Sequence, residues 1–144
     1  MVSAKWITGG SDNIKEVRRI LEKNVPPELL KYITQAQPDA KYIAVYSGGT
    51  LAAAGILDIA VINNEAAMIG PVAVSEAYRR QGLGGLIMRM MIRRAYERGY
   101  SRHFVTATEE TAGFFESLGF IGVSTQKDSL IRMEREGDVG GECG

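Results

Sequence analysis

The stretch that decides the fold is Val74-Ser75-Glu76-Ala77-Tyr78-Arg79-Arg80-Gln81-Gly82-Leu83-Gly84-Gly85-Leu86-Ile87-Met88. A strand-like apolar segment passes here through a basic turn with glycines into an amphipathic helix. Glycine at positions 82, 84 and 85 removes the side chains that would keep an anion from the backbone. The N–H groups of a helix's first turn have no acceptor within the helix and lie at the positive end of its dipole. The stretch predicts a phosphate-binding helix N-terminus, although a helix-starting turn without a ligand uses the same residues.

Two motifs, spaced along the chain, indicate a family. Arg79-x-x-Gly82-x-Gly84 follows the apolar run 68–74, and Thr111-Ala112-Gly113-Phe114-Phe115-Glu116-Ser117-Leu118-Gly119-Phe120 comes after it in the chain. The first resembles the Arg/Gln-x-x-Gly-x-Gly/Ala signature of the GNAT superfamily of acetyl-CoA-dependent N-acetyltransferases. The second is similar to a later helix of that family, which usually ends in Leu-Tyr-Glu-Lys-Leu-Gly-Phe. The resemblance covers residues 5–135. A Rossmann dinucleotide site is not indicated, because the chain has neither the Gly-x-Gly-x-x-Gly motif nor an acidic residue about 20 positions beyond it.

Length and charge favour one small domain. The 144 residues are enough for a single core, which we expect over residues 1–136, with residues 137–144 as a flexible C-terminal tail. Seventeen basic and 17 acidic residues cancel, so no net field attracts nucleic acid or an anionic membrane. Several arginines near the glycines would suit a polyanionic cosubstrate or form a solvated helix face.

Localisation and redox chemistry follow from what the sequence lacks. No apolar run has the roughly 20 residues of a membrane span, and no signal peptide is evident at the N-terminus. We expect a cytoplasmic protein without a bound metal. Cys143 is the single cysteine, so no internal disulfide can form.

The apolar spacing along the chain predicts alternating strands and helices. We expect a capping box at Asn13 and Glu16, a second helix opened by Pro27, and a helix from Arg80 to Arg98. The expected strands are 5–8, 42–46, 51–61, 66–74, 103–108, 121–124 and 130–133, with turns at 63–64 and 127–128 and a short helix at 110–118. The resulting order, β-α-α-β-β-β-α-β-α-β-β, is that of the GNAT fold. The fold class is α+β (mixed α/β), with a mixed, largely antiparallel sheet that the resemblance implies is splayed around CoA.

The resemblance also implies where acetyl-CoA binds. The pyrophosphate would meet the N–H groups of Gln81, Gly82, Leu83, Gly84 and Gly85, with Arg79 and Arg80 at the mouth of the site. The backbone of Val72, Ala73 and Val74 would pair with the pantetheine arm as an added strand would, and the N–H of Val74 or Ala73 would donate to the thioester oxygen. Thr108 stands where many members have an asparagine that contacts the pantetheine. Phe115 would form a wall of the same channel.

The proton-transfer groups of the family are missing. Phe115 replaces a tyrosine that protonates the leaving thiolate in many members, and Met68 replaces a glutamate base of the protein-lysine branch. The remaining titratable side chains near the expected splay are weak catalytic candidates, since each also has an ordinary structural or capping role; they are His103, Glu109 and Glu65, followed by Glu110, Tyr46 and Asp58. We therefore assign no catalytic residue, and expect proximity and orientation, worth up to about 7 to 11 kcal/mol, to provide most of the rate.

Three functions remain open. The leading hypothesis is an N-acetyltransferase that moves an acetyl group from acetyl-CoA to a primary amine of a small molecule by direct attack. A protein or peptide acetyltransferase is the second, weakened by Met68 and by the lack of an acidic patch to hold a lysine-rich tail. A non-catalytic acyl-CoA-binding module is the third, because Phe115 cannot donate a proton. We also expect a homodimer through an edge strand at Leu130-Ile131-Arg132-Met133.

Overall fold

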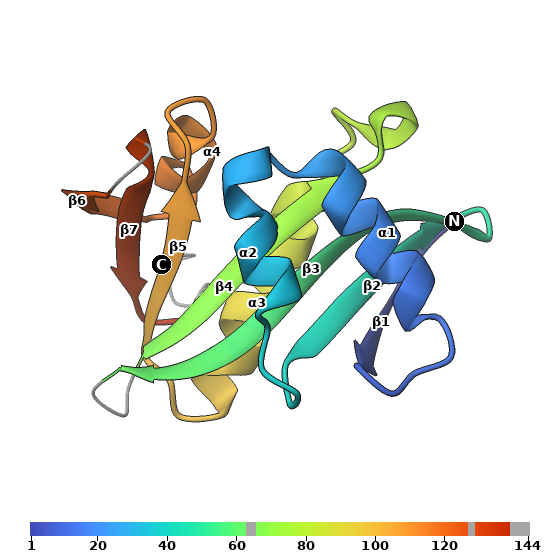
Figure 1. Ribbon diagram of the computed structural model, residues 1–144, viewed down its shortest axis with the longest axis horizontal. Coiled ribbons are helices and arrows are strands. Elements are labelled where there is room, and N and C mark those ends of the chain that lie inside the picture. The colour runs from blue at the N-terminus through green and yellow to red at the C-terminus, as the bar shows by residue number, and fades with distance from the viewer. Residues whose placement is uncertain (63–65, 127–128, 139–144) are drawn as a thin grey trace.

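The computed structural model describes residues 1–62, 66–126 and 129–138. Its helices and strands follow the predicted order (Figure 1). They are β1 (Val2–Thr8), α1 (Ile14–Asn24), the 3-10 turn η1 (Pro27–Leu29), α2 (Leu30–Thr34), β2 (Lys41–Ser47), β3 (Thr50–Ile62), β4 (Ala66–Val74), the 3-10 turn η2 (Glu76–Tyr78), α3 (Leu83–Glu97), β5 (Arg102–Ala107), α4 (Ala112–Glu116), β6 (Ile121–Thr125) and β7 (Ile131–Glu136).

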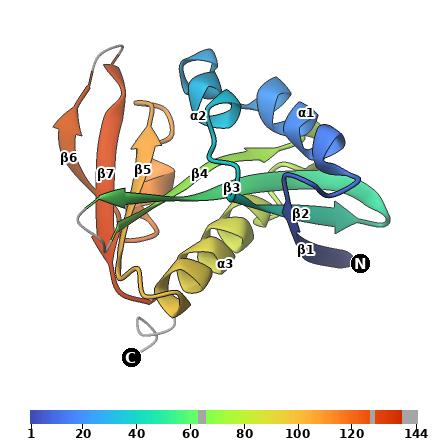
Figure 2. The ribbon, with the colours of Figure 1, turned by 60° about the horizontal axis from the view of Figure 1, so that its bottom comes forward.

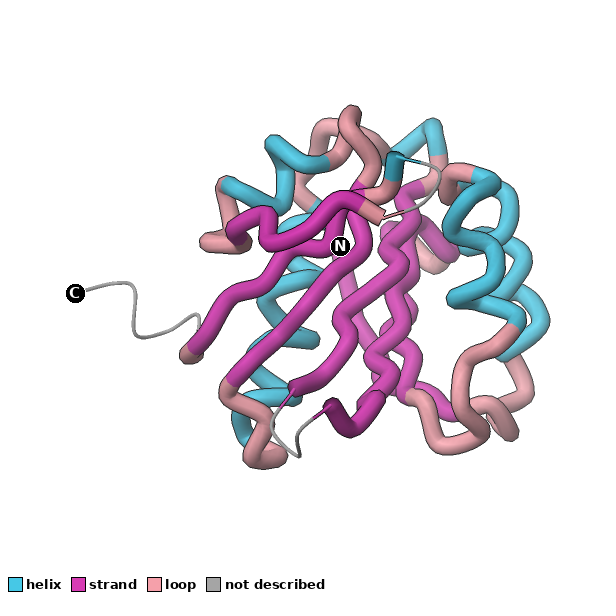
Figure 3. Tube along the Cα trace, turned by 60° about the vertical axis from the view of Figure 1, so that its left-hand side comes forward, coloured by secondary structure: helices cyan, strands magenta, loops and turns pink. Residues whose placement is uncertain are grey.

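One sheet in the order β1-β2-β3-β4-β5-β7-β6 carries the helices on its two faces. Helices α1 and α2 lie on one face and α3 on the other (Figure 2), and Figure 3 shows helices on both sides of the strands. Every neighbouring pair is antiparallel except β4 and β5, which run parallel. This is the mixed, largely antiparallel sheet that the sequence predicted.

The sheet is splayed between β4 and β5. These strands pair only where Ala66, Ala67 and Met68 face Arg102, His103 and Phe104. Beyond this short ladder the strands diverge, as Figure 1 shows. The predicted splay is therefore confirmed.

A β-bulge in β4 accounts for the divergence. Gly55 pairs with Val72 and Leu57 with Ile69, so the two-residue step on β3 is matched by a three-residue step on β4. An extra residue on one strand bends that strand and increases its twist. Pro71 lies in the bulge and has no N–H to contribute to a ladder. The bulge thus turns the second half of β4 away from β5.

Helix α3 packs closely against the centre of the sheet. Ile87, Met91 and Ile92 are fully buried and belong to the main core cluster. A Cβ added at Gly55 would lie 2.7 Å from Ile87 Cγ2. Glycine at 55 therefore lets α3 approach β3, which holds the helix and its N-terminal turn in place under the splay.

Three expectations need correction. Residues 130–133 do not form an edge strand, because β7 lies between β5 and β6 and the edge is β6. The capping box at Asn13 and Glu16 is wrong, because the Asn13 side chain makes no cap hydrogen bond and instead donates to the Tyr46 hydroxyl at 2.8 Å. The helix expected at 110–118 is shorter, since the Thr108 and Thr111 side chains hydrogen-bond to each other and to the backbone before α4 begins.

The expected turns at 63–64 and 127–128, and residues 139–144 of the expected tail, lie outside the described residues. The first two tail residues are anchored. Gly137 donates its N–H to the Ser101 carbonyl at 2.9 Å, and Asp138 forms an ion pair with Arg93 at 3.3 Å.

Candidate functional site

The turn before α3 presents free backbone N–H groups. Gly82 has φ +78° and is the N-cap residue, and Arg80 also has a positive φ of 65°. The first hydrogen bond of the helix runs from Leu86 N–H to Gly82 O. Within the described chain, the N–H groups of Leu83, Gly84 and Gly85 have no acceptor. This is the geometry that favours an anion at a helix N-terminus.

Space at Gly84 is left open by the chain itself. A Cβ added there would lie 3.6 Å from Phe114 and 3.8 Å from Val74, which are ordinary contact distances. Packing within the protein therefore does not require glycine at this position. Close approach of a ligand to the backbone would require it, so a pyrophosphate fits the residues present.

The diverging part of β4 has an open edge. Ser75 donates its N–H to Ala52 O on β3 at 2.8 Å. In an antiparallel ladder successive N–H groups alternate in direction, so Ala73 also faces β3, while the N–H groups of Val72 and Val74 face the splay. Of the two N–H groups expected at the thioester oxygen, that of Val74 faces the splay, whereas that of Ala73 faces β3. The Val72 N–H faces the splay as well.

Arg79 closes one end of this open edge. Its Nε donates to the Val74 carbonyl at 3.1 Å and its Nη2 donates to Asn24 Oδ1 at 3.3 Å. The guanidinium thereby links the end of β4 to the end of α1. Arg80 and Gln81 are exposed in the same turn.

A central cavity of about 50 Å³ lies in the splay. Its walls come from both faces of the sheet and include Tyr32 of α2, Val72 of β4, Thr106 of β5 and Phe115 of α4. The Phe115 ring is held by edge-on contacts with Phe114 at 5.1 Å and Phe120 at 5.9 Å. A cavity of this size accommodates a group of a few atoms, such as an acetyl thioester.

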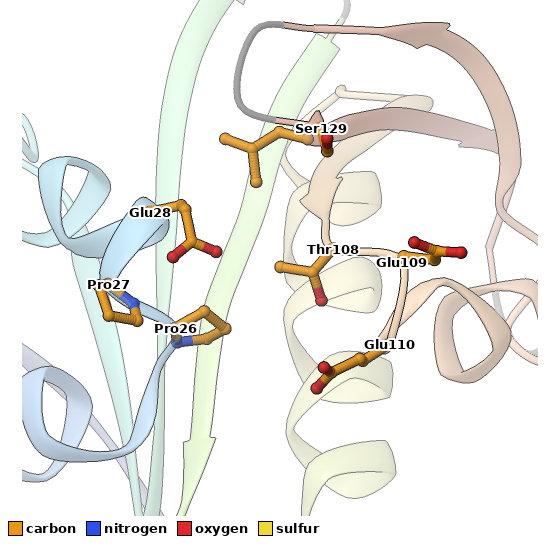
Figure 4. A pocket seen from close by; sticks show the side chains of 8 residues that line it. Pro26, Pro27, Glu28, Thr108, Glu109, Glu110 and Ser129 are labelled. Atoms are coloured by element: carbon orange, nitrogen blue, oxygen red, sulfur yellow. The ribbon is translucent and has the colours of Figure 1, made fainter.

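An acidic groove of about 690 Å³ adjoins the central cavity at Pro26. It lies between the α1–α2 connection and the start of β7, and it is lined by Glu28, Thr108, Glu109 and Glu110. In Figure 4 the carboxylates of Glu28 and Glu110 point into the groove, whereas Glu109 points away from it. Thr108 lines the same groove, and its hydroxyl lies 3.1 Å from the hydroxyl of Thr111.

A side cavity of about 310 Å³ shares Tyr32, Met68 and Thr106 with the central cavity. Its lining carries charges of both signs, from Lys31, Asp58 and Arg132. Asp58 is 5% exposed, and its Oδ2 accepts the Gln37 N–H at 3.1 Å. Its Oδ1 has no hydrogen-bond partner in the described chain, and burial raises the pKa of this carboxyl above its ordinary value.

His103 is held in a buried network away from the three cavities. It is 1% exposed, its Nε2 lies 2.8 Å from the Tyr100 carbonyl, and its Nδ1 lies 3.2 Å from Arg135 Nη1. Because a guanidinium only donates, Nδ1 accepts and Nε2 carries the proton. Burial, together with the Arg135 charge, lowers the pKa of His103 to about 4. The imidazole is neutral at pH 7 and its catalytic role stays a prediction.

The remaining predicted residues are only partly brought together. Val72 and Phe115 line the central cavity and Thr108 lines the adjoining groove, while residues 79–85 form the turn at the N-terminus of α3. Glu65 lies outside the described residues. Sequence reasoning missed Tyr32 and Glu28, because nothing in their spacing indicates that α2 and η1 lie beside the splay.

Comparison with known proteins identifies the family. The model of the acetyltransferase (GNAT) family matches residues 12–120. The chain belongs to the GNAT acetyltransferases. GNAT enzymes are acetyl-CoA-dependent acetyltransferases, and this fold carries the free helix N-terminus and open strand edge described above. Among curated proteins, no sequence matches this chain.

Solved structures share the GNAT fold at low sequence identity. The ribosomal-protein-S18-alanine N-acetyltransferase from Escherichia coli has 18% identity and a TM-score of 0.72, covering 94% of this chain and 95% of that chain. N-acetylglutamate synthase from Neisseria gonorrhoeae, solved with coenzyme A and N-acetyl-glutamate, has 18% identity and a TM-score of 0.70, covering 94% of this chain and 35% of that chain. A GNAT family acetyltransferase from Elizabethkingia anophelis with acetyl-CoA bound has 15% identity and a TM-score of 0.70, covering 94% and 97%.

Two further properties concern the described residues alone. Across residues 1–62, 66–126 and 129–138, no group of three His, Cys, Asp or Glu side chains is arranged to hold a metal ion. In the same ranges, no helix has the length and hydropathy needed to cross a membrane.

Proposed function

We propose that this GNAT enzyme transfers the acetyl group of acetyl-CoA to the primary amine of a small molecule, by direct attack in a ternary complex. The observation that carries this proposal is the central cavity, which joins the open edge of β4 to the side cavity. Acetyl-CoA would enter from the α3 side and the acceptor from the α2 side. The two substrates would meet where there is room for little more than the reacting atoms.

The roles of the backbone follow from its orientation. The N–H groups of Leu83, Gly84 and Gly85 would bind the pyrophosphate, and the N–H groups of Val72 and Val74 would hold the pantetheine arm and the thioester oxygen. Fixed donors aimed at an oxygen that becomes negative in the transition state commonly lower the activation barrier by a few kcal/mol.

The side cavity supports a small acceptor. Its volume of about 310 Å³ is at the lower end of the range for small-molecule sites. Asp58 offers a buried carboxyl that would attract an ammonium group, whereas Lys31 and Arg132 offer positive charge in the same lining. An amine that also carries an anionic group, such as an amino acid, complements this lining best.

A second candidate is transfer to a protein or peptide N-terminus or lysine. The acidic groove favours it, because Glu28 and Glu110 point into a space of about 690 Å³ that suits a basic peptide segment (Figure 4). The expected lack of an acidic patch is wrong, because the glutamates of this groove come from segments far apart in the sequence and meet only in the fold.

An acceptor screen tests both candidates. CoA release from acetyl-CoA would be measured with amino acids, polyamines and basic peptides. Turnover with small amines that is unaffected by Glu28→Gln supports the first proposal, and turnover with peptides that falls in Glu28→Gln supports the second. CoA binding without release for any acceptor would contradict both and favour the acyl-CoA-binding module.

We also propose a homodimer, now through β6. This edge strand is exposed along its length, with Ile121 70% and Val123 53% exposed. An open strand edge with apolar side chains favours pairing with another strand. A dimeric mass in sedimentation at micromolar concentration, lost in Val123→Lys, is the expected result; a monomeric wild type contradicts it.

A further inference from the structure

We propose that Tyr32 of α2 is the general acid that protonates the CoA thiolate, and that it replaces the hydroxyl missing at Phe115. The inference rests on the proposed acetyl transfer. Tyr32 and Phe115 both line the central cavity, Tyr32 from the α2 side of the sheet and Phe115 from α4. The proton donor would thus reach the sulfur from the opposite wall of the same small space.

Tyr32 is selected by elimination among the described residues of the cavity lining. Only Tyr32, Thr106 and Thr111 there have a side chain with an exchangeable proton. The Thr111 hydroxyl is engaged by the N–H and hydroxyl of Thr108, at 2.9 and 3.1 Å. Thr106 is an aliphatic alcohol and a far weaker acid than a phenol. Tyr32 is therefore the best proton donor in this part of the chain.

The Tyr32 side chain is positioned by its ring and not by its hydroxyl. The ring packs on the small cluster of Ala66, Met68 and Phe104, and Lys31 Nζ lies 5.3 Å from its centroid. The hydroxyl has no hydrogen-bond partner among the described residues, whereas those of Tyr42 and Tyr46 are bonded to Arg18 and Asn13. The packed ring limits how far Tyr32 can move, while its hydroxyl is left available to a substrate.

The proton balance closes within the site once the acceptor is a neutral amine, its ammonium proton having been lost to solvent. The amine nitrogen attacks the thioester carbon and forms the C–N bond, and the C–S bond breaks with its electron pair on sulfur. The Tyr32 O–H proton goes to the sulfur and gives the CoA thiol. The resulting phenolate takes the proton that the nitrogen loses, which regenerates the phenol. Because Tyr32 also lines the side cavity, it borders both the sulfur and the proposed acceptor.

Moving the hydroxyl across the cavity tests the role. Tyr32→Phe keeps the ring and is expected to lower kcat about a hundredfold or more, the usual range for a general acid, with the KM for acetyl-CoA nearly unchanged. Adding Phe115→Tyr to Tyr32→Phe is expected to restore kcat at least about tenfold. Tyr96→Phe, at a residue 43% exposed on α3, is the matched control with wild-type kcat. A Tyr32→Phe kcat within about threefold of wild type overturns the proposal.

A binding experiment tests the contact even if no acceptor is turned over. Affinities for CoA and for desulfo-CoA, which lacks the thiol, would be measured by calorimetry. Tyr32→Phe is expected to weaken CoA about threefold to tenfold, the effect of one hydrogen bond, and to leave desulfo-CoA unchanged. Equal affinities of variant and wild type for CoA, or an equal loss for both ligands, overturn the contact with sulfur. A wild type inactive with every acceptor, but with the selective loss for CoA, would instead refute the acetyl transfer alone.

Discussion

Arg79 donates from Nε to the carbonyl oxygen of Val74 at 3.1 Å, so the arginine of the glycine motif is bound to the strand that precedes it. Its Nη2 also reaches Asn24 Oδ1 at 3.3 Å. The sequence placed Arg79 at the mouth of the phosphate site. In the structure it fixes the relative positions of β4, α1 and the turn that leads to α3.

Arg79→Lys tests whether this arginine acts by geometry or by charge. Lysine keeps the charge but lacks the second donor in a fixed plane. We expect Arg79→Lys to weaken CoA binding almost as much as Arg79→Ala, measured by calorimetry at two salt concentrations. Arg98→Ala, exposed at the end of α3, is the control. Full affinity in Arg79→Lys would show that only the charge matters.

Gly84→Val is expected to abolish close approach of the pyrophosphate and weaken CoA binding by at least about tenfold. The first carbon of a side chain has room at this position, so the variant is expected to fold. Circular dichroism and thermal unfolding check the fold, and Gly122→Ala on β6 serves as a glycine control. Unchanged affinity in a folded Gly84→Val protein would falsify the pyrophosphate assignment.

Phe115→Ala is expected to lower both stability and CoA affinity. The ring contacts Phe114 and Phe120 and lines the central cavity. Truncation of a large aromatic costs about 3 kcal/mol or more when it is well packed, which urea unfolding would measure. Phe115→Tyr alone is expected to leave kcat within a few-fold of wild type. A large gain in kcat from Phe115→Tyr would mean that the wild type has no effective acid.

His103 makes stability depend on pH. Burial lowers the pKa of His103 to about 4, while the unfolded chain binds the proton with a pKa near 6.5. As the pH falls below 6.5, the unfolded state gains a proton that the folded state does not bind, so the unfolding free energy decreases. The total loss down to pH 4 is about 3 kcal/mol, at about 1.4 kcal/mol for each pKa unit. Urea unfolding at pH 7 and pH 5 measures it, and an identical pH dependence in His103→Gln would assign it to other groups.

The sequence predicted most of the fold where local patterns are strong. The run 66–88 encodes a strand, a glycine turn and an amphipathic helix within consecutive residues, and β4 spans the predicted residues. Helix α3 begins at Leu83 and not at the predicted Arg80, because Arg80 and Gly82 have positive φ. The edge at residues 130–133 was wrong, because strand order depends on pairing between distant segments and no local spacing records it. The sequence could not predict which N–H groups of β4 face the splay, because this depends on the register between β4 and β3.

The catalytic side of the site was less predictable than the cosubstrate side. The free N–H groups belong to one short segment, whereas Tyr32 and Phe115 are far apart in the sequence and meet only because α2 and α4 flank the splay. Helix α2 spans five residues, too few for a clear periodic signal. Glu110 was among the candidates, but its place in one groove with Glu28 was not predicted, because the two carboxylates come from segments far apart in the sequence.

The short ladder between β4 and β5 is the backbone pairing that joins two groups of strands in the described part of the chain. Strands β1 to β4 follow one another in sequence and pair with their neighbours, and β5, β6 and β7 form a second antiparallel group. The two groups meet at the ladder from Ala66 to Met68 and in the main core cluster, where α3 packs together with side chains of both groups. Separation at this seam would widen the path to the reacting atoms without breaking either group. We expect hydrogen exchange to show the ladder amides opening before those of β2, β3 or β7, at a free energy below that of global unfolding.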